Sequence, residues 1–493
     1  MLAYKRFTKD VVLVTIVNIL VVIKGIIFLP LITKMLGAFS YGVWAQILIT
    51  VGLIAPIVRL GLSNSIVRFV AAEKNKEEIR EGVYSALLLV SILSAIVFLS
   101  FLAFLGPIAS FFQAPKILVI ILPLIILFEC FNVILLSTFQ ALLAMKQYSL
   151  SMILLSLAEI IFVVISVYLG YGLIGAIASL LIAKAMAFIL IYSKVYRTIG
   201  AKFPTFHLAK KYLSFGIPTL LSNVSYLAVT SIDKYLIGFF LGTLFVGYYA
   251  PAYSLGNVIT FFIIPISFVL FPAVSKSYDE GKLHEVRTKL RYSLKYFLMV
   301  AVPSVFGMSV LMKQILTIFT TEDIAMNAFF ITPFVASSIL FYGASDIFSL
   351  ILTLVKKTRL VGYIWIAAAV ANILLNLLLI PKIGILGAAL ATLAAYVFAF
   401  TLIWYHSSKE LTFSIDWMAI IKILFCSAVM SLVVWSIHPQ STLMTILTII
   451  TGMTCYGALI ILTKTFTKRE LEFLKDLRKG QAQLPTTPSA ASN

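Results

Sequence analysis

Charged side chains that lie within long apolar segments, or at their ends, are the residues of this 493-residue chain best suited to chemistry. A charge in the middle of such a segment costs at least ~2.5–3.5 kcal/mol if the segment enters a membrane, so each one needs a role or a partner. The candidates are four cations and four carboxylates: Lys24, Lys234, Arg59, Arg68, Asp233, Glu129, Glu159 and Asp346.

The cations have the chemistry of phosphate ligands. Lys24 lies about 20 Å along a helix that begins near residue 11, at 1.5 Å per residue. We predict that Lys24 and Lys234 face a central cavity and bind one substrate phosphate together; the alternative for Lys24 is a structural ion pair or a side chain that snorkels to the membrane surface. Arg59 and Arg68 flank the segment GLSN at 61–64, and a guanidinium binds phosphate through paired hydrogen bonds. Both arginines are predicted to gather phosphate head groups; the alternative is that they only set the orientation of the chain in a membrane.

Three of the acids are candidates for coupling to an ion gradient. Glu129, Glu159 and Asp346 each stand alone near the middle of an apolar segment, and buried acids of this kind form proton and ion pathways in transporters. The alternative is that each acid, in its protonated form, hydrogen-bonds a neighbouring helix. Lys184 is predicted to pair with Glu159 on the adjacent helix.

Asp233 and Lys234 are adjacent in sequence, and neighbouring side chains on one helix do not face each other. We therefore expect that they do not pair. One of them is expected to face the cavity and the other a neighbouring helix, with Asp233 either joining a network with the lysines or titrating.

The elements that must position these residues are membrane helices. Hydrophobic residues make up 61% of the chain, charged residues 12%, and the mean hydropathy is +1.08. A soluble domain carries about 25% charged residues, so the composition indicates a polytopic membrane protein. A span needs about 20 mostly apolar residues. The fourteen predicted spans are 11–34, 41–60, 83–106, 117–143, 148–169, 172–194, 213–240, 243–270, 292–314, 328–355, 360–380, 383–406, 417–437 and 442–463.

Basic residues predict the orientation of these spans. Most of the 38 Lys and Arg residues fall on one side of the membrane if both termini are cytoplasmic, as the positive-inside rule requires. The net charge of +19 is therefore attributed to membrane insertion and not to nucleic-acid binding. The four His and three Cys are scattered without metal-binding spacing. We predict a multi-pass protein of the cytoplasmic membrane without a metal site.

An internal repeat organises the spans. Spaced identities recur about 205 residues apart in one register, which indicates duplication. The matching pairs are Asn18 and Asn223, Leu36-Gly37 and Leu241-Gly242, Gly42 and Gly247, and Ala45 and Ala250. We predict an all-α fold of two six-helix lobes related by a pseudo-two-fold axis along the membrane normal. The predicted divisions are an N-lobe at 1–211, a C-lobe at 212–410, two added helices at 411–463 and a basic cytoplasmic tail at 464–493.

Three stretches carry a family resemblance: DKYLIGFFLGTLFVGYYAPAYSLG at 233–256, LGAFSYGVW at 36–44 and LLNLLLIPKIGILGAALAT at 374–392. They resemble the polysaccharide-transport branch (O-antigen-type, Wzx-like flippases) of the multidrug/oligosaccharidyl-lipid/polysaccharide exporter superfamily. The resemblance implies two lobes around a cationic cavity. It also implies that an undecaprenyl- or dolichyl-pyrophosphate-linked oligosaccharide is flipped from the cytoplasmic to the outer leaflet.

The sequence thus favours a flippase that moves a polyprenyl-(pyro)phosphate-linked oligosaccharide by alternating access for cell-surface glycan assembly, and not an enzyme. Its expected partners are this substrate, membrane lipids and glycan assembly proteins; no cofactor is expected, and coupling to H⁺ or Na⁺ stays open. One alternative is a cation-coupled drug antiporter of the same superfamily, whose cavity would be dominated by acids, whereas lysines offset them here. Another is a membrane glycosyltransferase or ligase that uses lipid-linked glycan, which would need a large outside loop or a DxD-like metal site.

Overall fold

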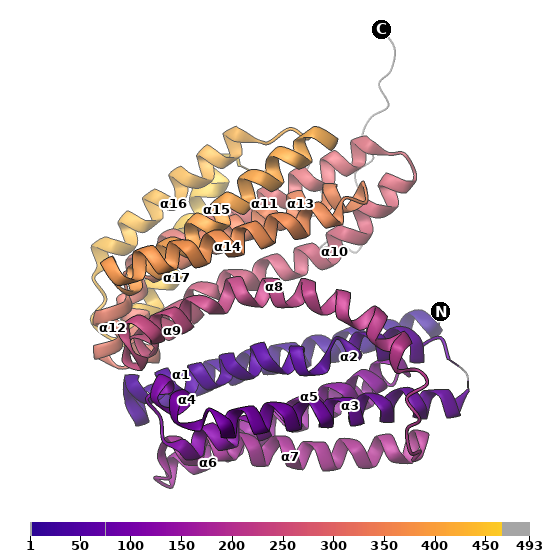
Figure 1. The fold of residues 1–493 in the computed structure, drawn as a ribbon. Coiled ribbons are helices and arrows are strands. Elements are labelled where there is room, and N and C mark those ends of the chain that lie inside the picture. The colour runs from indigo at the N-terminus through magenta and orange to yellow at the C-terminus, as the bar shows by residue number, and fades with distance from the viewer. Residues whose placement is uncertain (1, 74, 466–493) are drawn as a thin grey trace. The chain divides into compact units, whose positions relative to one another are not determined.

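The computed structural model describes residues 2–73 and 75–465, and these residues form helices joined by short connections, without a strand (Figure 1). The all-α prediction is therefore confirmed for this part of the chain. The helices are α1 (Leu2–Arg59), α2 (Leu62–Val70), α3 (Lys76–Ala103), α4 (Leu105–Phe112), α5 (Lys116–Ala141), α6 (Met145–Tyr168), α7 (Gly172–Ile199), α8 (Ala209–Leu241), α9 (Thr243–Gly256), the 3-10 helix η1 (Asn257–Ile259), α10 (Thr260–Asp279), α11 (Leu283–Phe319), α12 (Glu322–Ala328), α13 (Thr332–Leu354), α14 (Thr358–Ile383), α15 (Ile385–Glu410), α16 (Trp417–Ile437) and α17 (Thr442–Leu462).

Twelve helical segments of the described residues are long and apolar enough to cross a membrane. Helices suit this setting because their backbone N–H and C=O groups are satisfied internally, which hydrocarbon requires. The difference from the fourteen predicted spans lies in two elements. Helix α1 carries the first two predicted spans, separated by Gly37, whose φ of 83° and ψ of 173° interrupt the helical backbone. Helix α8 carries the seventh predicted span and is not among the twelve.

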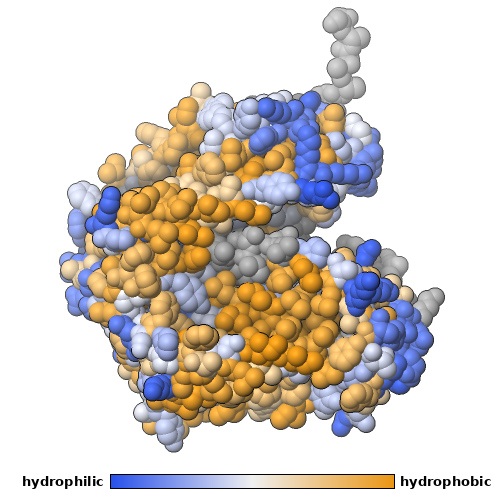
Figure 2. All heavy atoms as spheres, viewed as in Figure 1, coloured by the Kyte–Doolittle hydropathy of each residue, from blue (hydrophilic) through white to orange (hydrophobic). Residues whose placement is uncertain are grey.

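The outward-facing side chains of these helices suit a lipid surrounding. Leu99, Ile161, Ile189 and Phe425 are among many exposed large hydrophobic residues, which water would disfavour. In the view of Figure 2, hydrophobic residues cover the middle of the helices and hydrophilic residues gather toward their ends. This distribution is that of a multi-pass membrane protein.

The chain forms two compact units. The first comprises Met1–Leu255, Leu316–Ile331 and Arg359–Ala399, and the second Gly256–Ile315, Thr332–Thr358 and Phe400–Asn493. These divisions differ from the expected boundaries at 211 and 410, so the division into two six-helix lobes stays a prediction. The predicted basic tail lies outside the described residues from 466 onward. All candidate residues except Asp346 belong to the first unit.

Repeat-related positions in the first unit have similar backbone conformations and equivalent contacts. Gly242 separates α8 from α9 with a φ of 93° and a ψ of 169°, close to the values of its match Gly37. Glycine suits this left-handed conformation because it has no Cβ. The helical segments on either side of each glycine touch at equivalent positions. In the first repeat the rings of Phe28 and Trp44 meet edge to face; in the second, the matching Tyr249 donates a hydrogen bond to Asp233.

The two repeats also meet reciprocally near these glycines, at what we call the turn end of the first unit. A Cβ placed on Gly42 would lie 2.1 Å from the Thr243 carbonyl oxygen, and one on Gly247 would lie 1.9 Å from the Ala38 carbonyl oxygen. Ala38 and Thr243 are themselves a repeat-related pair. The glycine of each repeat therefore packs against the equivalent carbonyl oxygen of the other repeat. Both glycines are therefore required for the close approach of α1 and α9.

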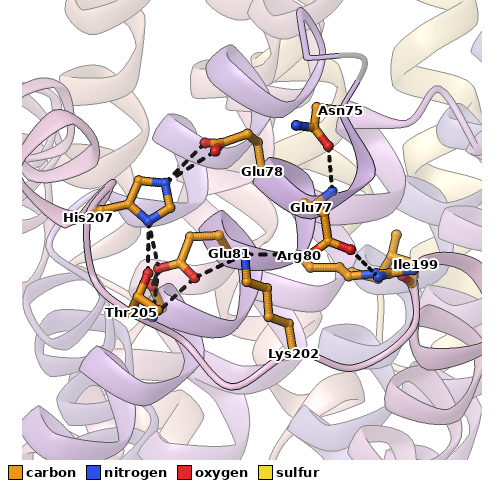
Figure 3. A network of polar contacts seen from close by, with 10 residues as sticks. Asn75, Glu77, Glu78, Arg80, Glu81, Ile199, Lys202, Thr205 and His207 are labelled. Atoms are coloured by element: carbon orange, nitrogen blue, oxygen red, sulfur yellow. Dashed lines mark hydrogen bonds and ion pairs between the residues drawn. The ribbon is translucent and has the colours of Figure 1, made fainter.

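The opposite end of the first unit is called the basic end, because α2, α3 and α8 place Arg68, Lys76 and Lys211 there. Figure 3 shows the polar network that fixes the connection between α7 and α8 onto α3 at this end. The carboxylate of Glu81 is fully buried and accepts the Thr205 N–H at 2.9 and 3.1 Å. Such burial is tolerated because protein hydrogen bonds replace water. The connection between the two repeats is thereby tied to the bundle of the first one.

Candidate functional site

Four of the charged residues within the predicted spans form one chain of ion pairs, which we call the charge cluster: Lys24, Glu159, Lys184 and Glu129. Lys24 Nζ lies 2.5 Å from Glu159 Oε2. Lys184 Nζ lies 2.7 Å from Glu159 Oε1 and 2.7 Å from Glu129 Oε2. The residues come from α1, α6, α7 and α5 in that order, and α7 packs against both α5 and α6 (Figure 1).

The charge cluster is closed in its middle and open at its two ends. The side chain of Glu159 is 2% exposed, whereas Lys24 and Glu129 keep 24% and 27% of their side-chain surface. A buried ion pair is maintained only if each charge keeps a partner, because an uncompensated buried charge is costly. A ligand can therefore reach the cluster at Lys24 or at Glu129 while Lys184 continues to neutralise Glu159.

The structure confirms the predicted pair of Lys184 with Glu159. The expectation that Glu129 is unpaired is wrong, because Lys184 also reaches its carboxylate. Glu159 has a second partner, Lys24, in addition to the predicted one. Arg59 lies beside the cluster as well, near Glu129 and Cys130. It adds a further cation there, and its contact with phosphate head groups stays a prediction.

A second buried polar group joins α8 to α9. Lys234 Nζ lies 3.0 Å from Asp233 Oδ1, and the Tyr249 hydroxyl donates to Asp233 Oδ2 at 2.8 Å. The ammonium also lies 3.5 Å from the centre of the Tyr253 ring, which attracts a cation through its face. The expectation that Asp233 and Lys234 do not pair is wrong, because the flexible lysine stem bends back to the carboxylate of the preceding residue.

This second group is more enclosed than the charge cluster. Asp233 and Lys234 are both buried, and Tyr249 also hydrogen-bonds Thr392 of α15. Thr392 in turn accepts from Asn372 of α14 at 3.5 Å. In the later part of the repeat, residues 171–179 match 383–391 at an offset of 212, and Asn372, 213 residues after Glu159, is the corresponding polar residue. Lys24 and Lys234 thus have separate sets of partners, and their joint action on one phosphate stays a prediction.

Asp346 lies in the second unit and is half-buried on α13. Its carboxylate accepts a hydrogen bond from Ser267 of α10. Among the described residues, no lysine or arginine lies within ion-pair distance of Asp346, as expected of a lone acid. Its role in coupling stays a prediction.

Arg68 is exposed at the basic end of the first unit and lines a cavity of about 570 Å³. Gln140 of α5 and Tyr148 of α6 line the same cavity. Sequence reasoning missed these two, because an amide and a phenol near the end of a span carry no signal of their own. Across the described part of the chain, no group of three or more His, Cys, Asp or Glu could hold a metal ion.

Comparison with known sequences identifies two matching families. Residues 7–278 match the family described as Polysaccharide biosynthesis protein, and residues 218–378 match MatE. The probable flippase AglR of Haloferax volcanii is 29% identical over 178 residues, or 35% of this chain and 37% of that protein. The probable low-salt glycan biosynthesis flippase Agl15 of the same organism is 23% identical over 195 residues, or 40% of this chain and 41% of that protein. The chain thus aligns with less than half the length of each of these relatives.

Comparison with solved structures identifies the fold. The lipid II flippase MurJ in an inward closed conformation has a TM-score of 0.77 at 18% identity, covering 94% of this chain and 100% of that one. An inward-facing multidrug resistance MATE family transporter has a TM-score of 0.65 at 17% identity, covering 83% of this chain and 95% of that one. Since the match at 7–278 spans more than half of the chain, this protein belongs to the polysaccharide biosynthesis protein family, in the polysaccharide-transport branch of the multidrug/oligosaccharidyl-lipid/polysaccharide exporter superfamily.

Proposed function

We propose that this protein is a flippase that moves a polyprenyl-(pyro)phosphate-linked oligosaccharide from the cytoplasmic to the outer leaflet by alternating access. The observation that carries the proposal is the charge cluster, in a chain that belongs to the polysaccharide biosynthesis protein family. A pyrophosphate and a polar glycan must cross ~30 Å of hydrocarbon, where an isolated charge is unstable. A cation held within the protein lowers that barrier, while the lipid tail stays in the bilayer.

Exchange of partners within the charge cluster is the proposed means of binding. Lys24 is the less buried of the two lysines of the cluster, and its carboxylate partner Glu159 is also held by Lys184. A phosphate oxygen that approaches Lys24 can therefore replace Glu159 as its partner without leaving a buried carboxylate unpaired. Lys234 would need to leave Asp233 and the Tyr253 ring to reach the same phosphate. We therefore propose Lys24 as the first phosphate contact and Lys234 as a second.

Coupling to H⁺ or Na⁺ is proposed to act through Glu129, Glu159 or Asp346. Glu129 is the less buried of the two acids of the charge cluster and shares Lys184 with Glu159. Protonation of Glu129 would neutralise it, so that Lys184 would pair with Glu159 alone. Lys24 could then leave Glu159 and bind phosphate more easily.

No cofactor and no catalytic step are proposed. The basic end is proposed to be cytoplasmic, with both termini on that side of the cytoplasmic membrane, and glycan assembly proteins are the proposed partners.

Complementation tests this function. We expect the wild-type chain to restore surface delivery of a lipid-linked glycan in a host that lacks its own flippase. Lys24→Gln should lose most of that delivery, and Lys24→Arg should keep part of it because the charge persists. The measurement is surface glycan at matched amounts of membrane protein. A wild-type chain that reaches the membrane but restores no delivery, with glycans of several types, would refute the proposal.

A further inference from the structure

The cavity at the basic end has the size and the mixed lining of a ligand site. Its volume of about 570 Å³ falls within the ~300–1,000 Å³ of ordinary small-molecule pockets. Four helices of the first unit form its wall, namely α2, α5, α6 and α8. None of the four residues of the charge cluster lines it. The cavity is therefore a second place where a polar ligand can be held.

One part of the lining provides a cation and groups that bind hydroxyls. The Arg68 side chain is exposed, and no hydrogen bond or ion pair to its guanidinium occurs among the described residues. Asn64 and Gln140 each offer an amide donor and an amide acceptor, and Tyr148 offers a ring with a hydroxyl. A guanidinium binds a phosphate through two parallel hydrogen bonds, and amides and a phenol suit the hydroxyls and the ring face of a sugar.

The remaining lining is apolar and comes partly from the second repeat. Leu136 and Met152 lie on α5 and α6, and Phe215 lies on α8. Asn64 Nδ2 donates to Thr219 Oγ1 of α8 at 3.3 Å across the cavity wall. The wall is thus shared by α2 of the first repeat and α8 of the second.

Close backbone contact holds α8 at this wall. A Cβ on Gly61 would lie 2.1 Å from the Gly216 carbonyl oxygen, and one on Gly216 would lie 2.5 Å from the Leu60 carbonyl oxygen. No side chain fits between these segments, so the position of α8 beside α2 is fixed in this conformation. The cavity keeps its shape only while this contact is made, and a movement of α8 away from α2 would remove one of its walls.

We infer that this cavity is a reception site for the diphosphate and first sugar of the glycan lipid, occupied before the phosphate reaches Lys24. The inference rests on the proposed function for the identity of the substrate. Arg68 binds the diphosphate, Asn64 and Gln140 bind sugar hydroxyls, and Tyr148 covers the sugar ring. The same chemistry is found in a soluble nucleotide sugar, so the test must separate a lipid-linked diphosphate from a nucleotide-linked one.

Direct binding to the purified full-length protein in lipid nanodiscs tests the inference. The probes are citronellyl-diphosphate N-acetylglucosamine, citronellyl diphosphate and UDP-N-acetylglucosamine, with Kd measured for each. We expect the first probe to bind most tightly. Arg68→Gln should weaken its binding at least about tenfold, as loss of a charge-assisted phosphate contact does, and Arg68→Lys should recover part of this. Tyr148→Leu should remove the advantage of the sugar-bearing probe over citronellyl diphosphate.

Arg197→Gln is the matched control, because Arg197 is an exposed arginine in the last turn of α7 at the same end and does not line the cavity. The inference would be overturned if Arg68→Gln and Arg197→Gln lost affinity for citronellyl-diphosphate N-acetylglucosamine equally while both unfolded at the wild-type temperature. It would also be overturned if UDP-N-acetylglucosamine bound more tightly than the citronellyl-linked probe. If Arg68→Gln is misfolded, the Tyr148→Leu comparison decides. Glycan delivery by a wild-type chain that binds none of the probes would overturn the reception site and leave the flippase function standing.

Discussion

Lys184→Met is expected to destabilise the protein more than loss of any surface lysine, by about 3–5 kcal/mol, because removing one partner of a buried ion pair leaves a charge uncompensated. Lys184 contacts both Glu129 and Glu159 at 2.7 Å. Without it, Glu129 loses its lysine partner and Glu159 keeps only Lys24. The measurement is the thermal unfolding temperature of purified protein, together with glycan delivery, which should fall to background.

Two further variants separate this explanation from a general effect of mutation. Lys382→Met is the control, since Lys382 is exposed in the last turn of α14 and such substitutions change stability by about 0.5 kcal/mol or less. The double variant Lys184→Met with Glu129→Gln should be more stable than Lys184→Met alone, because its remaining pair of Lys24 and Glu159 is balanced. A single variant that unfolds at the wild-type temperature, or a double variant less stable than the single one, contradicts the role of the charge cluster.

Gly247→Ala is expected to prevent the close approach of α1 and α9 at the turn end. The added Cβ would lie 1.9 Å from the Ala38 carbonyl oxygen, and a backbone atom cannot move aside as a flexible side chain does. Overpacking costs about 1–3 kcal/mol when side chains adapt, so this backbone clash should cost at least the upper value. Folded yield and unfolding temperature in detergent measure the effect, and transport should fall with them.

Gly52→Ala is the matched control, because Gly52 also lies in α1 but has no atom within 4 Å of an added Cβ. Alanine is favoured over glycine in a helix, so this variant should be at least as stable as the wild type. Gly42→Ala should resemble Gly247→Ala, and the double variant should cost less than the sum of both, since the same contact is lost only once. Wild-type stability of Gly247→Ala would show that the two helices are not in close contact here.

Apolar runs and repeat spacing predict most of the helices and the turn glycines. A membrane helix requires an uninterrupted apolar stretch, which makes its position visible in one sequence. The match of Gly37 with Gly242 likewise predicts two interruptions of the same kind, and both have positive φ. These properties depend on local sequence, so they can be read without knowledge of which helices are neighbours.

The partners of the charged residues could be predicted only in part. Lys184 lies one helix away from Glu159, so that pair could be foreseen, but its contact with Glu129 depends on how α5 packs against α7. The Asp233–Lys234 pair depends on the lysine rotamer and on the Tyr249 and Tyr253 rings around it. The division into two units depends on packing between residues far apart in sequence, which periodicity does not describe.

Transfer of a lipid-linked oligosaccharide across a vesicle membrane tests the central claim most directly. Purified protein would be reconstituted with a fluorescent short-chain diphosphate-linked oligosaccharide in both leaflets, and the fraction cleaved by an externally added glycosidase followed over time. We expect the inner-leaflet pool to become accessible in vesicles with wild-type protein, and slowly or not at all with folded Lys24→Gln or in protein-free vesicles. The account would be contradicted if, under imposed H⁺ and Na⁺ gradients, vesicles with wild-type protein protected the inner-leaflet pool as well as protein-free vesicles do. If the same vesicles moved a cationic dye, the result would favour the antiporter.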